Sequence, residues 1–309
     1  MRRVTATFLA LVLTGMLCAA TTAQSAGNLR YSISVAAFPN ESGWHGQWDV
    51  GDGFSTIMTA ALDASDHFIV LGDTEMRGEA LREQDFAASG RTAGGKKAPK
   101  TGRMTPAQLL VRGSITHVQH DTTGGKGGLS FKGVRIGGSK GKAEINITVY
   151  LEDTETGQVK ASTKVIGKSG RKGLSLGYSG ADLGGLTGDM AGFKKDNLGK
   201  ATEDAVAQTI EFLIEQLENI PWEGTIVLAK PDKLVINRGS REGVTEGMKF
   251  EVGSIEELVD PDTGEVLDVE LTKVATIQAT QVKEKISYCK AVDGGGNVKK
   301  GMSFFPLNR

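Results

Sequence analysis

The four histidines are the first candidates in this chain for binding a metal or acting as a general base. His117 and His120 are three residues apart on a predicted strand. Side chains at that spacing point to opposite faces of a strand, so the two imidazoles are not expected to share a metal ion. His45 lies in a predicted loop, and His67 is expected near solvent at the end of a helix. The histidines therefore predict no metal centre.

Two glycine-containing segments match fragments of nucleotide-binding loops. Gly167-Lys168-Ser169 matches the end of a phosphate loop, but Ser162 stands where the first glycine is required, and no helix is predicted to follow. Residues 51–53 read Gly-x-Gly, but Thr56 occupies the place of the third glycine of a dinucleotide fingerprint. Neither segment predicts a bound nucleotide, and no cofactor is expected.

The remaining reactive side chains have simpler explanations. Cys289 lies in a β pattern among apolar neighbours, with no histidine nearby in the sequence, so a buried thiol is favoured over a nucleophile. Asp260, Asp262 and Glu265 surround a Pro-Asp-Thr-Gly turn, which could bind calcium weakly but is more simply a polar hairpin turn. Because no set of residues could carry a reaction, the chain is predicted not to be an enzyme.

The N-terminus indicates export from the cytoplasm. Arg2 and Arg3 precede an apolar stretch, and small residues follow it up to Ala20 or Ala23. This order is typical of a signal peptide, here residues 1–23, and the stretch is too short to span a membrane as a helix. Leu17 directly before Cys18 disfavours lipidation of that cysteine. The mature protein is therefore predicted to be exported and to lie outside the cytoplasm.

Charge and glycine content restrict the function further. The formal net charge is −1, so no global basic field favours nucleic acid as a partner. Glycine accounts for 42 of the 309 residues, about twice the usual share, and much of the excess lies in residues 122–151 and 164–193. No segment after the signal is apolar enough for a transmembrane helix, so any membrane contact must be made by strands.

Residues 29–220 carry the pattern of a domain that mixes strands and helices. The predicted strands are 31–38, 68–71, 109–118, 145–149 and 158–166. The predicted helices are 54–62, 75–88 and 201–217, and Thr105 and Pro106 look like the start of another. On the second helix, Leu81 and Phe86 are the expected inward-facing residues. The two glycine-rich segments are then long hairpin arms carried by this domain.

Residues 222–309 change to short strands and tight turns, which predicts a small β-barrel or sandwich domain. The predicted strands are 225–228, 234–236, 248–252, 265–269, 274–282, 287–292 and 302–305. The predicted fold class is therefore α+β: a mixed sheet with helices and two glycine-rich β-hairpin arms, followed by a small all-β domain.

The first domain resembles the curli-secretion channel family, called CsgG-like, over about residues 29–220. The matching stretches are 34–40 (SVAAFPN), 56–71 (TIMTAALDASDHFIVL), 107–114 (AQLLVRGS), 152–157 (EDTETG) and 205–214. The resemblance implies a homo-oligomeric ring in the outer membrane, in which each subunit gives two β-hairpins to one shared barrel. It also implies that secreted unfolded polypeptide passes through this channel. The exported protein would then lie in the outer membrane or periplasm of a Gram-negative-type envelope.

The same resemblance suggests which residues form the channel. The loop after the first strand would narrow it, and the candidate constriction residues are Trp44, His45, Gln47 and Trp48. The arms contain apolar rows of the kind that faces lipid, and the candidate lipid-facing residues are Leu129, Phe131, Leu174, Leu176 and Tyr178. Lysine at mid-bilayer on that face would cost about 2–4 kcal/mol, so the many arm lysines are expected in the lumen or at the tips.

The second domain points to an alternative function. Its signature resembles the C-terminal domain of flagellar assembly protein T and comprises Val235-Ile236-Asn237, Gly239, Gly243-Val244, Gly247-Met248 and residues 260–264. That resemblance implies a periplasmic ring scaffold with accessory assembly proteins as partners. On this alternative, the arms are surface hairpins that pair with neighbouring subunits and do not enter lipid or form a pore.

Overall fold

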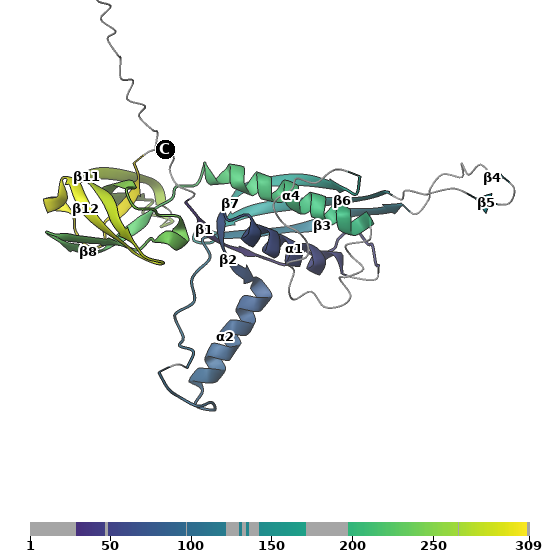
Figure 1. Cartoon of the computed structure of the whole chain (residues 1–309), viewed down its shortest axis with the longest axis horizontal. Coiled ribbons are helices and arrows are strands. Elements are labelled where there is room, and N and C mark those ends of the chain that lie inside the picture. The colour runs from purple at the N-terminus through teal and green to yellow at the C-terminus, as the bar shows by residue number, and fades with distance from the viewer. Residues whose placement is uncertain are drawn as a thin grey trace, which may run out of the picture.

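The computed structural model describes residues 29–46, 49–96, 98–121, 130–131, 134–135, 142–170, 197–264 and 266–307. They form an α/β unit and a closed six-stranded barrel that lies at one end of its long axis (Figure 1). The predicted α+β fold class is confirmed. The predicted barrel or sandwich is a barrel.

A five-stranded mixed sheet forms the centre of the α/β unit. In spatial order its strands are β2 (Phe68–Asp73), β1 (Tyr31–Val35), β3 (Leu109–Asp121), β6 (Lys142–Asp153) and β7 (Val159–Lys168). β1 is parallel to both β2 and β3, whereas β3, β6 and β7 are successively antiparallel. The antiparallel half is the half that carries the glycine-rich arms.

Two helices bury the apolar side chains of this sheet. α1 (Val50–Ala64) packs against β2 and against α4 (Asn197–Leu217), which in turn lies along β6 and β7 (Figure 1). Every second residue of β6 faces this layer, and the buried set is Ala143, Ile145, Ile147, Val149 and Leu151. Strict alternation of this kind is typical of a strand with one face in the core and one in solvent.

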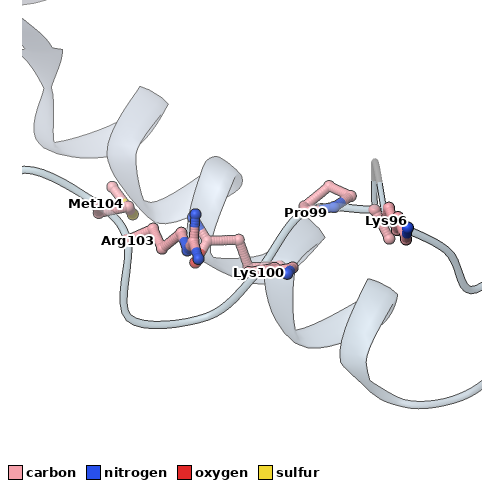
Figure 2. A pocket seen from close by; sticks show the side chains of 7 residues that line it. Lys96, Pro99, Lys100, Arg103 and Met104 are labelled. Carbon is pink, nitrogen blue, oxygen red and sulfur yellow. The ribbon is translucent and has the colours of Figure 1, made fainter.

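The third long helix, α2 (Thr74–Ala88), buries none of its residues. It begins directly after β2, where the Asp73 carboxylate accepts a hydrogen bond from the Met76 backbone N–H at 2.8 Å, and it points away from the sheet (Figure 1). The prediction that Leu81 and Phe86 face inward is wrong, because these side chains are 50% and 46% exposed. A pocket of about 320 Å³ lies between α2 and the loop that follows it (Figure 2).

The helix expected to start at Thr105 and Pro106 is also absent. The backbone there is bonded to β1 instead: the Pro106 carbonyl accepts a hydrogen bond from Ser32 Oγ at 2.9 Å, and the Gln108 N–H donates to the Ser32 carbonyl at 2.9 Å. The segment therefore leads directly into β3 in an extended conformation.

The barrel closes through β10-β11-β12-β9-β8-β13, with β13 paired to β10. Its strands are β8 (Gly224–Lys230), β9 (Lys233–Ile236), β10 (Lys249–Val259), β11 (Val266–Val282), β12 (Ser287–Asp293) and β13 (Ser303–Pro306). Short 3-10 turns occur at Ser240–Glu242 and Gly295–Asn297. The strands predicted at 265–269 and 274–282 are one strand, β11, because β10 pairs with it without a break between strands from Val266 to Gln278.

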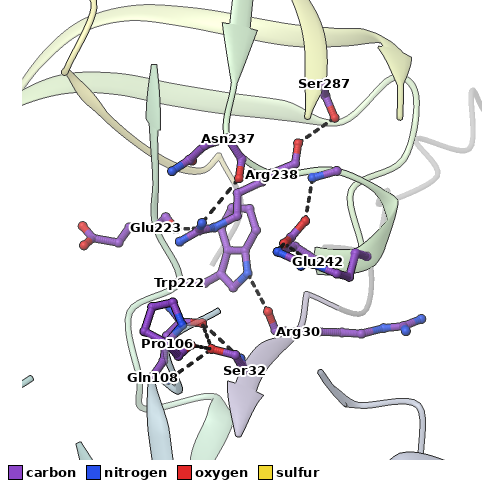
Figure 3. Close-up of polar contacts among 12 residues, drawn as sticks. Arg30, Ser32, Pro106, Gln108, Trp222, Glu223, Asn237, Arg238, Glu242 and Ser287 are labelled. Atoms are coloured by element: carbon purple, nitrogen blue, oxygen red, sulfur yellow. Dashed lines mark hydrogen bonds and ion pairs between the residues drawn. The ribbon is translucent and has the colours of Figure 1, made fainter. Parts of the chain in front are cut away.

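The α/β unit and the barrel meet at a joint centred on Trp222 (Figure 3). Its ring contacts Phe250 and Phe304, with ring centroids 6.1 and 5.9 Å away. The Trp222 Nε1–H donates to the Arg30 carbonyl at 3.3 Å, and the Arg30 N–H donates to the Glu242 carbonyl at 3.0 Å. Backbone groups of both parts are thus bonded across the joint, which fixes the orientation of the barrel.

Candidate functional site: the arm exits and the loop after the first strand

Both glycine-rich arms leave the sheet at the same end. The first connects β3 to β6, and the last register pair of that ladder is Asp121 with Lys142. The second begins after β7, whose final residue Lys168 is paired with Glu144 of β6. The two exits are therefore on neighbouring strands, and the barrel lies at the opposite end of the unit (Figure 1).

A short strand pair lies within the first arm. β4 (Ser130–Phe131) pairs antiparallel with β5 (Val134–Arg135), in the register Ser130 with Arg135 and Phe131 with Val134. The pair lies beyond the ends of β3 and β6 in Figure 1. The chain therefore reverses direction within this arm, as a hairpin requires.

Polar contacts to α4 and β6 hold the start of the second arm. The Asp204 carboxylate, on a residue only 3% exposed, accepts hydrogen bonds from the Lys168 backbone N–H at 2.9 Å and from Gln208 Nε2 at 3.0 Å. Ser169 bonds to β6 twice: its hydroxyl accepts from the Ala143 N–H at 2.9 Å, and its own N–H donates to the Ala143 carbonyl at 3.0 Å. These contacts fix the direction in which the chain leaves β7.

Gly167 allows β7 to approach α4 at this exit. A Cβ at Gly167 would lie 1.9 Å from the Ala201 carbonyl oxygen and 2.8 Å from the Ala205 Cβ. The sequence reasoning missed both Gly167 and Asp204. The sequence does contain a signal for Asp204. This acidic residue directly precedes Ala205 and so lies in the buried stripe of the helix. A carboxylate at a buried position needs hydrogen-bond donors.

The loop after β1 starts as an extension of the sheet. The Pro39 carbonyl accepts from the Ile115 N–H at 3.0 Å, and the Glu41 N–H donates to the Ile115 carbonyl at 2.9 Å, so the chain follows β3 beyond the end of β1. Phe38 is buried against Phe54, with ring centroids 4.6 Å apart. Gly113 of β3 leaves room for this ring, since a Cβ there would lie 2.6 Å from Phe38.

Within the loop, the side chain of Asn40 organises a tight turn. Asn40 Oδ1 accepts from the Ser42 N–H at 3.1 Å, and Asn40 Nδ2 donates to the Trp44 carbonyl at 2.7 Å. Trp44 is half-buried against the core, whereas His45 is exposed. The loop ends at Asp49, which caps α1 by accepting from the Gly51 N–H at 2.8 Å. Both ends of the candidate constriction loop are therefore anchored.

The loop lies on the side of the sheet that leads to the arms. It meets β3 at Ile115, and β3 continues for six more residues to Asp121. At about 3.3 Å per residue, the arm exits lie roughly 20 Å farther along the strand than the loop. The loop and the arm exits therefore lie at two different levels along β3.

Several candidate residues lie outside the described part of the chain. They are Gln47, Trp48, Leu129, Leu174, Leu176 and Tyr178. Phe131 belongs to β4, but its side chain is also outside the description. The lipid-facing row and the constriction assignment both stay predictions.

The other chemically capable residues form no site in the described structure. His117 and His120 are exposed on β3, and the described residues contain no group of three metal-ligating side chains. Cys289 is buried, which raises the pKa of its thiol to about 12 and makes it a poor nucleophile. Asp260 Oδ1 accepts from the Asp262 and Thr263 N–H groups at 2.7 and 3.2 Å, which is the hydrogen bonding of a polar hairpin turn.

Comparison with protein families assigns the chain to a class. Among the described residues, no helix combines the length and the hydropathy needed to cross a membrane. The model of the family described as "Curli production assembly/transport component CsgG" matches residues 16–226, more than half of the chain. Its class is therefore that of envelope assembly and transport proteins. The chain belongs to the CsgG family.

Three solved structures illustrate distant likenesses of this chain, and a search of the curated proteins finds no match. The PelC dodecamer from Paraburkholderia phytofirmans is 14% identical, with a TM-score of 0.31, over 59% of this chain and 86% of that one. The hypothetical protein CT253 from Chlamydia trachomatis is 12% identical, with a TM-score of 0.35, over 60% and 96%. The lipoprotein GNA1162 from Neisseria meningitidis is 13% identical, with a TM-score of 0.27, over 62% and 99%. Likeness at these scores supports no conclusion about function.

Proposed function

We propose that this chain is a subunit of an oligomeric outer-membrane channel for curli-type protein secretion. Each subunit would contribute two β-hairpins to a shared barrel. The observation that carries the proposal is the position of the arm exits: β3, β6 and β7 deliver both arms from neighbouring strands at one end of the sheet. Such side-by-side exits are what a subunit needs in order to add adjacent hairpins to a common sheet.

The proposed mechanism is passive conduction of unfolded polypeptide. No nucleotide is bound and no covalent step occurs, so the chain acts as a pore and not as an enzyme. The loop after β1 would form the constriction, because its two anchored ends hold it at a fixed level below the arms. Trp44 packs against its own subunit, so His45, which is exposed, is the better placed of these two to face a passenger chain.

A periplasmic ring scaffold without a pore is the second candidate function. The observation that favours it is the C-terminal barrel, which is bonded through Trp222 and Arg30 to the end of the unit opposite the arms. A module held in that way, with the signature resembling flagellar assembly protein T, suits docking of accessory assembly proteins. The lysines of the first arm also suit a hairpin that stays in water.

Deletion of residues 124–141 distinguishes the two functions. In the channel, this deletion removes the outer part of the first arm and should abolish membrane integration. In the scaffold, localisation should be unchanged. The measurement is fractionation of host membranes with carbonate and then detergent, followed by native size analysis. Release of the full-length protein by carbonate as a small assembly would contradict the channel.

Conductance provides the direct test of a pore. Purified full-length protein reconstituted in planar bilayers should give discrete openings, and the same preparation with residues 124–141 deleted should give none. Absence of both a ring in detergent and any conductance in lipid would rule out the proposed channel.

A further inference from the structure

Helix α2 lacks the packing that usually stabilises a helix in a protein. It has 15 residues and buries none of them, and no ion pair among the described residues supports it. Isolated helices of about 12–15 residues are marginal in water, because most helix stability in proteins comes from packing. Met76, Leu81 and Phe86 are exposed large apolar side chains on it. Burying this helix against a second surface would supply the missing packing.

The pocket beside α2 is positively charged. It is lined by Gln84 of α2 and by Lys96, Ala98, Pro99, Lys100, Arg103 and Met104 of the following loop (Figure 2). The loop from residue 91 to 103 contains five Lys and Arg residues and no Asp or Glu. Ala98, Pro99 and Met104 give the pocket an apolar wall within this basic rim. It therefore fits an apolar side chain that is flanked by carboxylates.

The tip of the β10–β11 hairpin offers that combination. Residues 254–272 contain seven Asp and Glu residues and no Lys or Arg. Leu267 is 64% exposed, and the register steps from Asp268 to Val266 at this point, so Leu267 is the extra residue of a β-bulge. A bulge changes the direction in which a side chain points. Here it leaves the large apolar side chain of Leu267 at the tip of an acidic hairpin.

Two opposed carboxylates of this hairpin have no ion-pair partner in the described structure, although Lys273 pairs with Glu251 farther from the tip. Glu256 and Glu270 are directly opposite each other in the ladder, and neither forms an ion pair within the described part of the chain. Like charges at directly opposed positions destabilise a strand pair. A basic surface brought against this face would relieve the repulsion.

We propose that the tip of the β10–β11 hairpin of one copy binds the basic pocket beside α2 of a second copy, with Leu267 entering the pocket. Glu256 and Glu270 then face Lys100 and Arg103. The proposal rests on the homo-oligomer of the proposed function and names one contact that holds it together. Within a single copy, the Trp222 joint fixes the barrel at the end of the long axis, while α2 points away from the sheet (Figure 1).

The contact joins two different surfaces, so it is heterologous. Every copy carries one hairpin and one pocket, so each copy can bind one neighbour on either side. Heterologous contacts produce a closed ring when the rotation between copies closes. Because opposite charges at a partly exposed interface are screened by salt, assembly should weaken as ionic strength rises above about 0.15 M.

Charge reversal tests the proposal on the full-length chain. K100E together with R103E, or E256K together with E270K, should each lower the association constant at least tenfold. Combining all four substitutions should restore assembly, because the two surfaces are again complementary. K299E with K300E reverses two exposed lysines of the barrel and is the matched control. The measurement is sedimentation velocity in detergent at several protein concentrations.

Cysteine cross-linking tests the same contact without altering charge. Chains carrying L267C and chains carrying M104C, expressed together, should form a covalent pair with a short bismaleimide, whereas either variant alone should not. Cys289 is buried and has a raised thiol pKa, so it does not compete. Absence of the cross-linked pair, or wild-type assembly of both charge-reversed variants, would overturn the contact.

The outcomes separate this contact from the proposed channel. If the wild-type chain assembles and conducts while all variants behave like it, the contact is wrong and the channel stands. If the wild-type chain forms no oligomer at all, the channel fails and the contact fails with it.

Discussion

The two ends of the α/β unit are fixed by different physical means. At the barrel end, the Trp222 ring packs with Phe250 and Phe304, and the Trp222 side chain and the Arg30 backbone N–H donate hydrogen bonds across the joint. At the arm end, a buried carboxylate and one close backbone approach, at Asp204 and Gly167, hold the chain. The barrel end is thus held by a packed core. The arm end fixes only the direction in which the chain leaves the sheet.

The largest effect is expected at the barrel end. Trp222→Ala should lower the free energy of unfolding by about 3–5 kcal/mol, because Trp222 is only 3% exposed and its removal leaves a cavity between aromatic rings. Trp44→Ala is the comparison, since Trp44 is half-buried and should lose less. Urea unfolding monitored by circular dichroism measures both. Equal losses in the two variants would contradict the role given to the joint.

At the arm end, steric conflict should produce the next largest effect. Gly167→Val puts side-chain atoms against the Ala201 carbonyl and should cost about 1–3 kcal/mol as β7 and α4 separate. Gly170→Val is the matched control, because a Cβ at Gly170 would have no neighbour within 4 Å. Thermal unfolding of the two variants gives the comparison. A similar melting temperature for both would show that β7 and α4 can separate without cost.

Loss of the carboxylate at the same exit should have an effect of comparable size. Asp204→Ala leaves the Lys168 backbone N–H without its acceptor and should destabilise the protein by about 1–3 kcal/mol. Asp204→Asn should cost less, since an amide oxygen can still accept that bond. Glu211→Ala, on the exposed face of α4, should change little. Amide hydrogen exchange at Lys168 should rise in Asp204→Ala, and unchanged protection there would argue against the bond.

The smallest effect concerns a turn that occurs in both parts of the molecule. The Asp153 carboxylate accepts hydrogen bonds from the Glu155 and Thr156 N–H groups, and Asp260 does the same for Asp262 and Thr263. At Asp153, burial raises the pKa, but these bonds and Lys160 outweigh it, so the pKa is lowered overall. The hydrogen bonds also lower the pKa of Asp260.

A lowered carboxyl pKa stabilises the folded state above the unfolded pKa of about 3.9 and loses that contribution as pH falls through the folded value. Asp153→Asn and Asp260→Asn should therefore each reduce the fall in melting temperature below about pH 4. The measurement is a series of melting curves between about pH 6 and pH 3. A slope identical to that of the wild type would mean that these bonds do not favour the ionised form.

Much of the fold could be predicted because its signals are local and periodic. The alternation of Ile145, Ile147 and Val149 predicts a strand with one buried face, and the structure buries all three. The stripe that contains Ala205, Ile210 and Leu213 likewise predicts the helix that covers that face. Patterns of this kind predict which side chains are buried within one chain, and in the α/β unit these side chains are buried.

The wrong predictions concern segments whose structure depends on residues that are far away in the sequence. Leu81 and Phe86 follow helical spacing, but no residue of α2 is buried by the described part of the chain. Pro106 looks like a helix start, but its carbonyl is bonded to Ser32 on β1, 74 residues away in the sequence. Leu267 and Val274 belong to one strand because the long strand β10 pairs with β11 from Val266 to Gln278. For the candidate site, the partners of Asp204 depend on how β7 packs on α4, which no local pattern of the sequence reports.

The ladder between β3 and β6 has one more consequence, for how this protein can evolve. The ladder runs from Leu109 to Asp121, and its return strand starts at Lys142, so the first arm is a connection between two strands that are already paired. Doubling the length of such a connection adds only about 0.6 kcal/mol of closure entropy. Arm length therefore has almost no effect on the free energy of folding of the sheet. Insertions or deletions in the arm can change how far the arm reaches, or the thickness of its apolar band, without disturbing the domain.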